Sequence, residues 1–131
     1  MQKKAKILLV DDDLDFIRAT KTVLESKAYQ VITANDGEEG LKKVVEERPD
    51  LIILDVMMPV KDGFTACKEL KTDPRYQPFS KIPVIMLTVY PDDRERAKLS
   101  MAEGMTMEAE DYLHKPVTPE ELLQRAEELL R

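Results

Sequence analysis

The chain lacks the features that mark membrane, secreted and disulfide-stabilised proteins. No run approaches the roughly 18 consecutive apolar residues of a membrane-spanning helix. The first four residues lead directly into a strand-like segment, so we expect neither a signal peptide nor a membrane anchor. Cys67 is the only cysteine, which excludes an internal disulfide and fits a reducing cytoplasm. The only histidine, His114, is expected to be structural or solvated rather than functional.

Basic residues are outnumbered and form no stripe along the chain. The sequence has 20 lysines and arginines against 26 acidic residues, a net charge of −6. This balance predicts no direct contact with nucleic acid. With 131 residues, 43% of them apolar and 35% charged, the chain suits one globular domain spanning residues 1–131.

Short apolar runs alternate with helical patterns throughout the sequence, with no linker and no repeat. We predict strands at 6–10, 31–34, 51–54, 82–87 and 112–114. Helical periodicity predicts helices around 16–24, 41–48, 64–70, 92–103 and 118–130, and Pro74 and Pro78 indicate a loop. Five such units with short crossovers predict an α/β fold, with a parallel sheet covered on both faces.

Polar side chains follow four of the predicted strands. Asp11 and Asp12 end the first strand, Asp55 the third, Thr88 the fourth and Lys115 the fifth. The carboxyl ends of parallel strands lie at one edge of the sheet, where ligands bind. Three carboxylates, a hydroxyl and an ammonium should therefore meet there. Three acids repel one another, and a divalent metal with a neighbouring lysine would explain the arrangement.

Individual residues of this set admit simpler interpretations. Asp13 is expected to cap the helix that follows it. For Asp11 and Asp12, a capping role and a ligand role both remain open. Asp55 is harder to explain as a cap, because Val56-Met57-Met58-Pro59 follows it. Thr88 alone is uninformative, because threonine is common in strands.

Taken in order, the motifs resemble the receiver domain of bacterial two-component response regulators. They are Val10-Asp11-Asp12, Leu54-Asp55-Val56-Met57-Met58-Pro59 with Asp62-Gly63, Thr88, and Tyr112-Leu113-His114-Lys115-Pro116. The resemblance covers essentially the whole chain. It implies a flavodoxin-like (βα)5 doubly wound parallel sheet with strand order 2-1-3-4-5.

The resemblance also implies a phosphorylation site that needs Mg²⁺. Asp55 would accept the phosphoryl group, and an aspartate carboxylate can act as such a nucleophile. Asp11, Asp12, Asp55 and the backbone carbonyl of Met57 would be the metal ligands, and hard oxygen ligands suit Mg²⁺.

Three further residues acquire roles by the same resemblance. Lys115 would stabilise the negative charge of the transition state. Thr88 would hydrogen-bond a phosphoryl oxygen, and Tyr112 would then move inward. This switch would alter the surface formed by the fourth helix, fifth strand and fifth helix.

The implied partners are proteins. A histidine kinase or a phosphotransferase would supply the phosphoryl group, and a downstream protein would read the phosphorylated form. A phosphorylation-dependent homodimer is also expected. The domain would catalyse only its own phosphorylation and dephosphorylation, and would not otherwise be an enzyme. We expect it in the cytoplasm, either alone or as part of a longer protein.

Three rival interpretations remain for comparison. A haloacid-dehalogenase-type phosphatase would place its nucleophile in an Asp-x-Asp motif after the first strand, and residues 11–15 match that motif poorly. A flavodoxin would need a Ser/Thr/Gly-rich phosphate loop there, whereas acids would repel the phosphate. The third is a receiver-like interaction module that is never phosphorylated.

Two positions depart from the common receiver pattern. Val89 stands where a small residue is usual, which should narrow access to Asp55. The run Gly104–Met107 resembles extra sequence before the fifth strand, which would either lengthen the fourth helix or remodel its connection to that strand.

Overall fold

The computed structural model describes residues 5–88 and 109–131. Its elements are β1 (Lys6–Val10), α1 (Leu14–Ser26), β2 (Gln30–Ala34), α2 (Gly37–Glu47), β3 (Leu51–Asp55), α3 (Gly63–Thr72), the 3-10 helix η1 (Pro74–Phe79), β4 (Val84–Thr88), β5 (Asp111–His114) and α5 (Pro119–Leu129). The helix expected at 92–103 lies outside the described residues, as do the departures at Val89 and Gly104–Met107.

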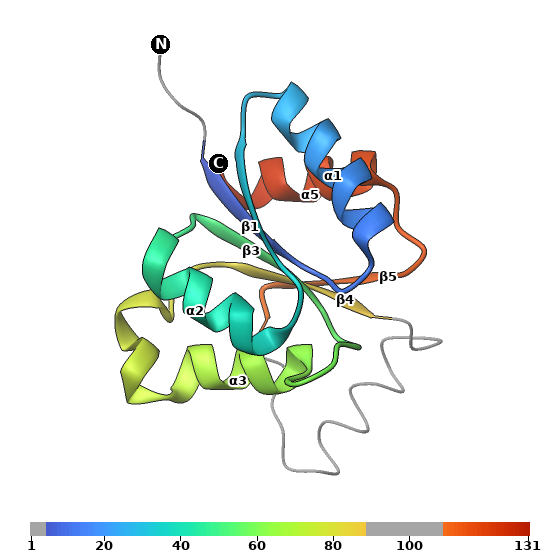
Figure 1. Cartoon of the computed structure of the whole chain (residues 1–131). Helices are drawn as coiled ribbons and strands as arrows, with labels where there is room; N and C mark the ends of the chain where they lie inside the picture. The colour runs from blue at the N-terminus through green and yellow to red at the C-terminus, as the bar shows by residue number, and fades with distance from the viewer. Residues whose placement is uncertain (1–4, 89–108) are drawn as a thin grey trace.

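Five parallel strands form one sheet in the order β2-β1-β3-β4-β5, which confirms the predicted order. Helices α1 and α5 cover one face, and α2 and α3 cover the other (Figure 1). The order changes direction between β1 and β3, so their carboxyl ends flank the crevice in which open α/β sheets bind ligands.

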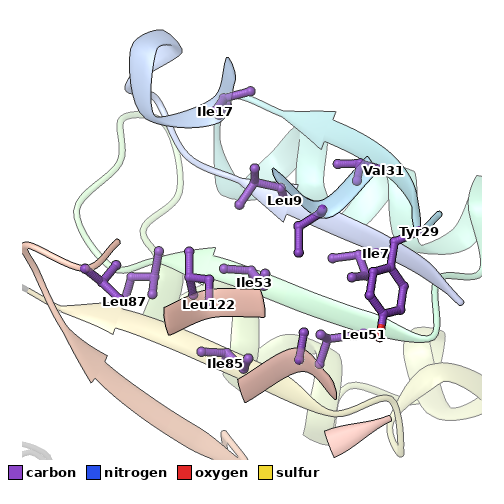
Figure 2. Packing of buried hydrophobic residues seen from close by; sticks show 13 residues of the cluster. Ile7, Leu9, Ile17, Tyr29, Val31, Leu51, Ile53, Ile85, Leu87 and Leu122 are labelled. Atoms are coloured by element: carbon purple, nitrogen blue, oxygen red, sulfur yellow. The ribbon is translucent and has the colours of Figure 1, made fainter. Parts of the chain in front are cut away.

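Alternate side chains of the central strands build a core on each face of the sheet. Ile7, Leu9, Ile53, Ile85 and Leu87 point toward α1 and α5, where they pack with other residues of one buried cluster (Figure 2). The intervening residues of the same strands face α2 and α3 in a second cluster. Because both faces are covered, the strand sequences are almost continuously apolar.

Each of the four described α-helices begins with a side chain that caps it. Asp13 Oδ1 accepts from the N–H of Asp15 at 3.1 Å, which confirms its predicted role. Asp36, Asp62 and Thr118 cap α2, α3 and α5 in the same way. These caps satisfy backbone donors that the first helical turn leaves unpaired.

Several boundaries differ from the sequence prediction. The segment expected to be a loop at Pro74 forms the 3-10 helix η1. Arg48 does not continue α2 but ends it, with a left-handed backbone whose N–H donates to the carbonyl of Val44. β4 begins at Val84 rather than Ile82, because the Ile82 carbonyl accepts from Lys71 Nζ at 2.7 Å instead of joining the sheet.

Candidate functional site

Asp55 is the last residue of β3, and the residue is 3% exposed. The chain turns sharply after it, because the N–H of Gly63 returns to the carbonyl of Val56 at 2.9 Å. A Cβ atom at position 63 would overlap the carbonyl oxygen of Asp55, so this position requires glycine. The Asp62-Gly63 pair therefore serves two purposes: Asp62 starts α3, and Gly63 lets that helix approach the strand end.

Asp11 and Asp12 follow β1 but occupy different environments. Asp11 is fully buried, and its Oδ1 accepts from the N–H of Asp13 at 3.0 Å. Asp12 is exposed. One carboxylate oxygen from each of Asp11, Asp12 and Asp55 lies within 4.8 Å of the others. The structure thus brings together the three acids that the sequence placed on two strands.

Lys115 supplies the positive charge of this cluster. Its Nζ lies 3.0 Å from Asp11 Oδ2 and 3.4 Å from Asp55 Oδ1. Its backbone N–H donates to the carbonyl of Thr88 at 2.7 Å, which fixes the end of β5 beside β4. Burial alone would lower the pKa of Lys115, but its contacts with Asp11 and Asp55 outweigh burial and raise that pKa, so the ammonium stays charged.

The surroundings of the Asp55 carboxyl raise its pKa. Burial raises its pKa most, the charge of Asp11 raises it further, and Lys115 lowers it in part. The result is a pKa of about 6, against an ordinary value of 3.8. Negative charge at Asp55 is therefore incompletely compensated by the protein alone at neutral pH.

We expect Asp55→Asn to stabilise the metal-free protein at pH 7 relative to wild type. A carboxyl whose pKa is raised on folding contributes stability below its unfolded pKa, and that contribution is lost as the pH rises through about 6. A shift of about two pKa units corresponds to about 3 kcal/mol in the free energy of unfolding. Urea unfolding in EDTA at pH 4 and pH 7 measures this difference. If the difference in unfolding free energy between variant and wild type is the same at both pH values, Asp55 is not the titrating group.

The three carboxylates form a donor set that fits a hard divalent cation. Their oxygens are close enough to share one ion, and two of the three side chains are buried. Mg²⁺ prefers oxygen ligands and retains water, which the exposed side of Asp12 would allow. The side chain of Met57 is 59% exposed, and the role of its backbone carbonyl stays a prediction.

Thr88 and Tyr112 lie on the two strands beyond Asp55. Thr88 is buried at the end of β4, one strand away from Asp55. Tyr112 is partly buried in β5 against the core beneath α2 and α3, and its hydroxyl accepts from the N–H of Ala109 at 3.2 Å. His114 is partly buried beside Thr88 in the same register.

One neighbour of Lys115 is not evident from the sequence motifs. The ring of Phe16, in the first turn of α1, has its centroid 5.0 Å from Lys115 Nζ. An ammonium at this distance is attracted by the face of an aromatic ring. The sequence feature that could have indicated this contact is the position of Phe16. It lies at the start of the helix that follows Asp11 and Asp12, at the same edge of the sheet as Lys115.

The chain is similar to known proteins over nearly its whole length. The profile of the response regulator receiver domain matches residues 7–127. The probable transcriptional regulator ycf27 of Cyanophora paradoxa is 43% identical over 98% of this chain. The alkaline phosphatase synthesis transcriptional regulatory protein PhoP of Bacillus subtilis is 40% identical over 96%. These matches cover 49% and 48% of the relatives, so the chain spans about half their length.

Solved structures share the fold over nearly the whole chain. The chemotaxis response regulator CheY4 of Vibrio cholerae has a TM-score of 0.78 and 36% identity, covering 96% of this chain and 98% of that one. The BeF3-activated N-terminal receiver domain of Klebsiella pneumoniae RstA has a TM-score of 0.76 and 31% identity, with coverage of 96% and 98%.

Proposed function

Since this chain belongs to the response regulator receiver domain family, we propose that it accepts a phosphoryl group on Asp55 from a histidine kinase or a phosphotransferase. The observation that carries the proposal is the buried Asp55 carboxylate, held 3.4 Å from Lys115 and within 4.8 Å of two further acids. Folding alone does not favour such a cluster, because the acids repel one another. Phosphoryl transfer needs a nucleophilic oxygen surrounded by groups that stabilise negative charge.

In the proposed reaction, an Asp55 carboxylate oxygen attacks the phosphorus of the donor. A new O–P bond forms, and the bond to the donor's leaving group breaks, the leaving group keeping the electron pair. Lys115 already contacts Asp55, so its ammonium lies where negative charge accumulates on the phosphoryl oxygens. Mg²⁺, held by Asp11, Asp12, Asp55 and the Met57 carbonyl, would neutralise the acids and bind the incoming phosphoryl oxygens.

The proposed switch passes through Thr88 and Tyr112. Thr88 would hydrogen-bond the new phosphoryl group with its hydroxyl, which lies one strand from Asp55. Tyr112 would then move inward toward the position that Thr88 leaves. The result would be an altered surface around β5 and α5, which a downstream protein or a second copy of the domain could recognise.

The effect of the proposed phosphorylation depends on which domain or protein recognises the phosphorylated form. The relatives of about twice this length carry names of transcriptional regulators, and this domain could similarly control an attached output domain or a separate protein. We propose protein partners for the domain itself and no direct contact with nucleic acid, because its net charge is −6. Within 5–88 and 109–131, no helix is long and apolar enough to cross a bilayer. We propose a cytoplasmic location, where histidine kinases deliver phosphoryl groups.

Incubation with acetyl phosphate and Mg²⁺ tests the proposed function. Intact-mass spectrometry should show one added phosphoryl group, and EDTA should prevent its addition. If neither acetyl phosphate nor a purified histidine kinase adds a phosphoryl group, the domain is a receiver-like interaction module. Catalytic turnover of a phosphate monoester would instead indicate a phosphatase.

Mg²⁺ is expected to raise the melting temperature of the unphosphorylated domain. An ion that binds the folded acid cluster stabilises the folded state by mass action. Asp12→Ala should remove most of this response, because Asp12 is one of the three carboxylates that can share the ion. Asp15→Ala, on an exposed acid of α1, is the control and should respond as wild type does. Equal responses in the Asp12 variant and wild type would place the ion elsewhere.

Beryllofluoride, a mimic of the phosphoryl group, is expected to move Tyr112 inward. Movement would break the hydrogen bond between its hydroxyl and the N–H of Ala109, which is 3.2 Å long in this structure. A crystal structure with and without the mimic measures the change directly. Unchanged positions of Thr88 and Tyr112 would contradict the proposed switch.

A further inference from the structure

A groove of about 930 Å³ lies along α2, outside the acid cluster. It runs from the segment before α2 to the loop between β3 and α3 and to η1, and it is lined by charged and apolar side chains. Its lining includes Glu38, Lys42, Val45 and Glu46 of α2, together with Val60 and Tyr76 from the other two segments. None of these residues takes part in the proposed phosphoryl transfer.

The groove exposes apolar side chains that the core does not use. Among the described residues, four large apolar side chains are exposed, and two of them, Val45 and Val60, line this groove. Val60 is 81% exposed and has a φ of 67°. A left-handed backbone is strained for a β-branched residue, and asparagine or glycine would relieve that strain. Fold stability therefore does not explain a valine here.

The charge around these apolar residues has one predominant sign. Four carboxylates line the groove against one ammonium: Asp36, Glu38, Glu39 and Glu46 against Lys42. Asp36 and Glu39 accept hydrogen bonds from the backbone at the start of α2. Glu38 remains 68% exposed, with Lys61 Nζ 3.4 Å away, and Glu46 is exposed. This surface thus offers an incoming molecule exposed negative charge beside exposed aliphatic side chains.

We propose that this groove binds an amphipathic helix of a partner protein, one that presents aliphatic side chains flanked by lysine or arginine. The aliphatic side chains would cover Val45 and Val60, and the basic side chains would face Glu38 and Glu46. A helix laid into a groove between structural elements is a common mode of peptide recognition. The 11 residues of α2 span about 16 Å, which matches about three turns of a partner helix. This docking does not depend on phosphorylation of Asp55.

The test uses two synthetic helical peptides of identical length and leucine spacing. One carries lysine on its polar face and the other carries glutamate. Titration of the ¹⁵N-labelled domain should give chemical-shift changes at α2, Val60 and Tyr76 with the lysine peptide only. Affinity should fall as the salt concentration rises, because exposed charge pairs are screened. Equal binding of both peptides, or shifts centred on another surface, would overturn the proposal.

Matched variants separate the groove from the general acidity of the chain. Glu38→Gln with Glu46→Gln should weaken binding of the lysine peptide about fivefold, the effect of two exposed charge pairs. Glu25→Gln with Glu128→Gln removes the same charge from exposed positions on α1 and α5 and should leave the affinity unchanged. Equal weakening by the two pairs would show that binding is nonspecific.

A second comparison tests the apolar contribution. Val60→Asn suits the left-handed backbone, so it should preserve stability while it weakens peptide binding. Leu14→Asn removes an exposed apolar side chain elsewhere and serves as its control. Unchanged affinity of the Val60 variant would overturn the proposed contact. Concentration-dependent shifts at these residues without peptide would identify a second copy of the domain as the occupant and would likewise overturn the proposal.

Discussion

Asp55→Asn is expected to abolish stable phosphorylation by acetyl phosphate in the presence of Mg²⁺. An amide cannot form the acyl phosphate, and the other two carboxylates are poorly suited to replace it. Asp11 is buried and bound to Lys115 at 3.0 Å, and Asp12 lies exposed in the short connection between β1 and α1. Intact-mass spectrometry should show the added phosphoryl group in wild type and none in the variant.

Asp13→Asn provides a matched control for this experiment. Asn caps helices as well as Asp does, so α1 should still begin correctly. The control removes an acid two residues from Asp11 but leaves the three-carboxylate cluster intact. Undiminished phosphorylation of the Asp55 variant would show that another residue accepts the group.

Lys115→Met is expected to destabilise the metal-free domain by about 3 kcal/mol, because the loss leaves buried carboxylates without their cation. Protonation of Asp55, whose pKa is already about 6, limits the cost, and the missing ammonium should raise that pKa further. Phosphorylation should slow by about a hundredfold or more, since one electrostatic group is lost from the transition state.

Urea unfolding in EDTA and in Mg²⁺ separates the two effects of this substitution. Mg²⁺ should restore part of the lost stability, because it also neutralises the acids. It should not restore the rate of phosphorylation. Lys68→Met, at an exposed position of α3, is the control and should change neither quantity appreciably. A Lys115 variant as stable and as reactive as wild type would remove Lys115 from the site.

Much of the fold was predictable because its signals are local. Each central strand is a short apolar run, and Asp13 and Thr118 cap the helices that the sequence indicated. The clustering of the polar side chains was predictable for a different reason. The end of a parallel strand is a fixed place in the sheet, so polar residues after such runs must meet at one edge.

Other features depend on packing between distant segments, which the sequence pattern does not contain. Asp11 and Asp12 have the same chemistry, yet one is fully buried and the other exposed. Asp11 also contacts Lys115, which lies more than a hundred residues away in the sequence. The raised pKa of Asp55 also depends on tertiary burial. The ring of Phe16 beside Lys115 follows from how α1 packs, and periodicity alone does not reveal it.

With Gly63 packed against the carbonyl of Asp55, the main chain at Asp55 cannot move toward α3. The next peptide is tied to β4, because the N–H of Val56 donates to the carbonyl of Leu87 at 2.9 Å. The main chain at this edge of the sheet is therefore restrained on the side that faces α3. Added bulk and charge on Asp55 would be accommodated by side chains on the side of Thr88 and Lys115. A chemical change at the Asp55 carboxylate would therefore displace side chains toward β4 and β5 rather than toward α3.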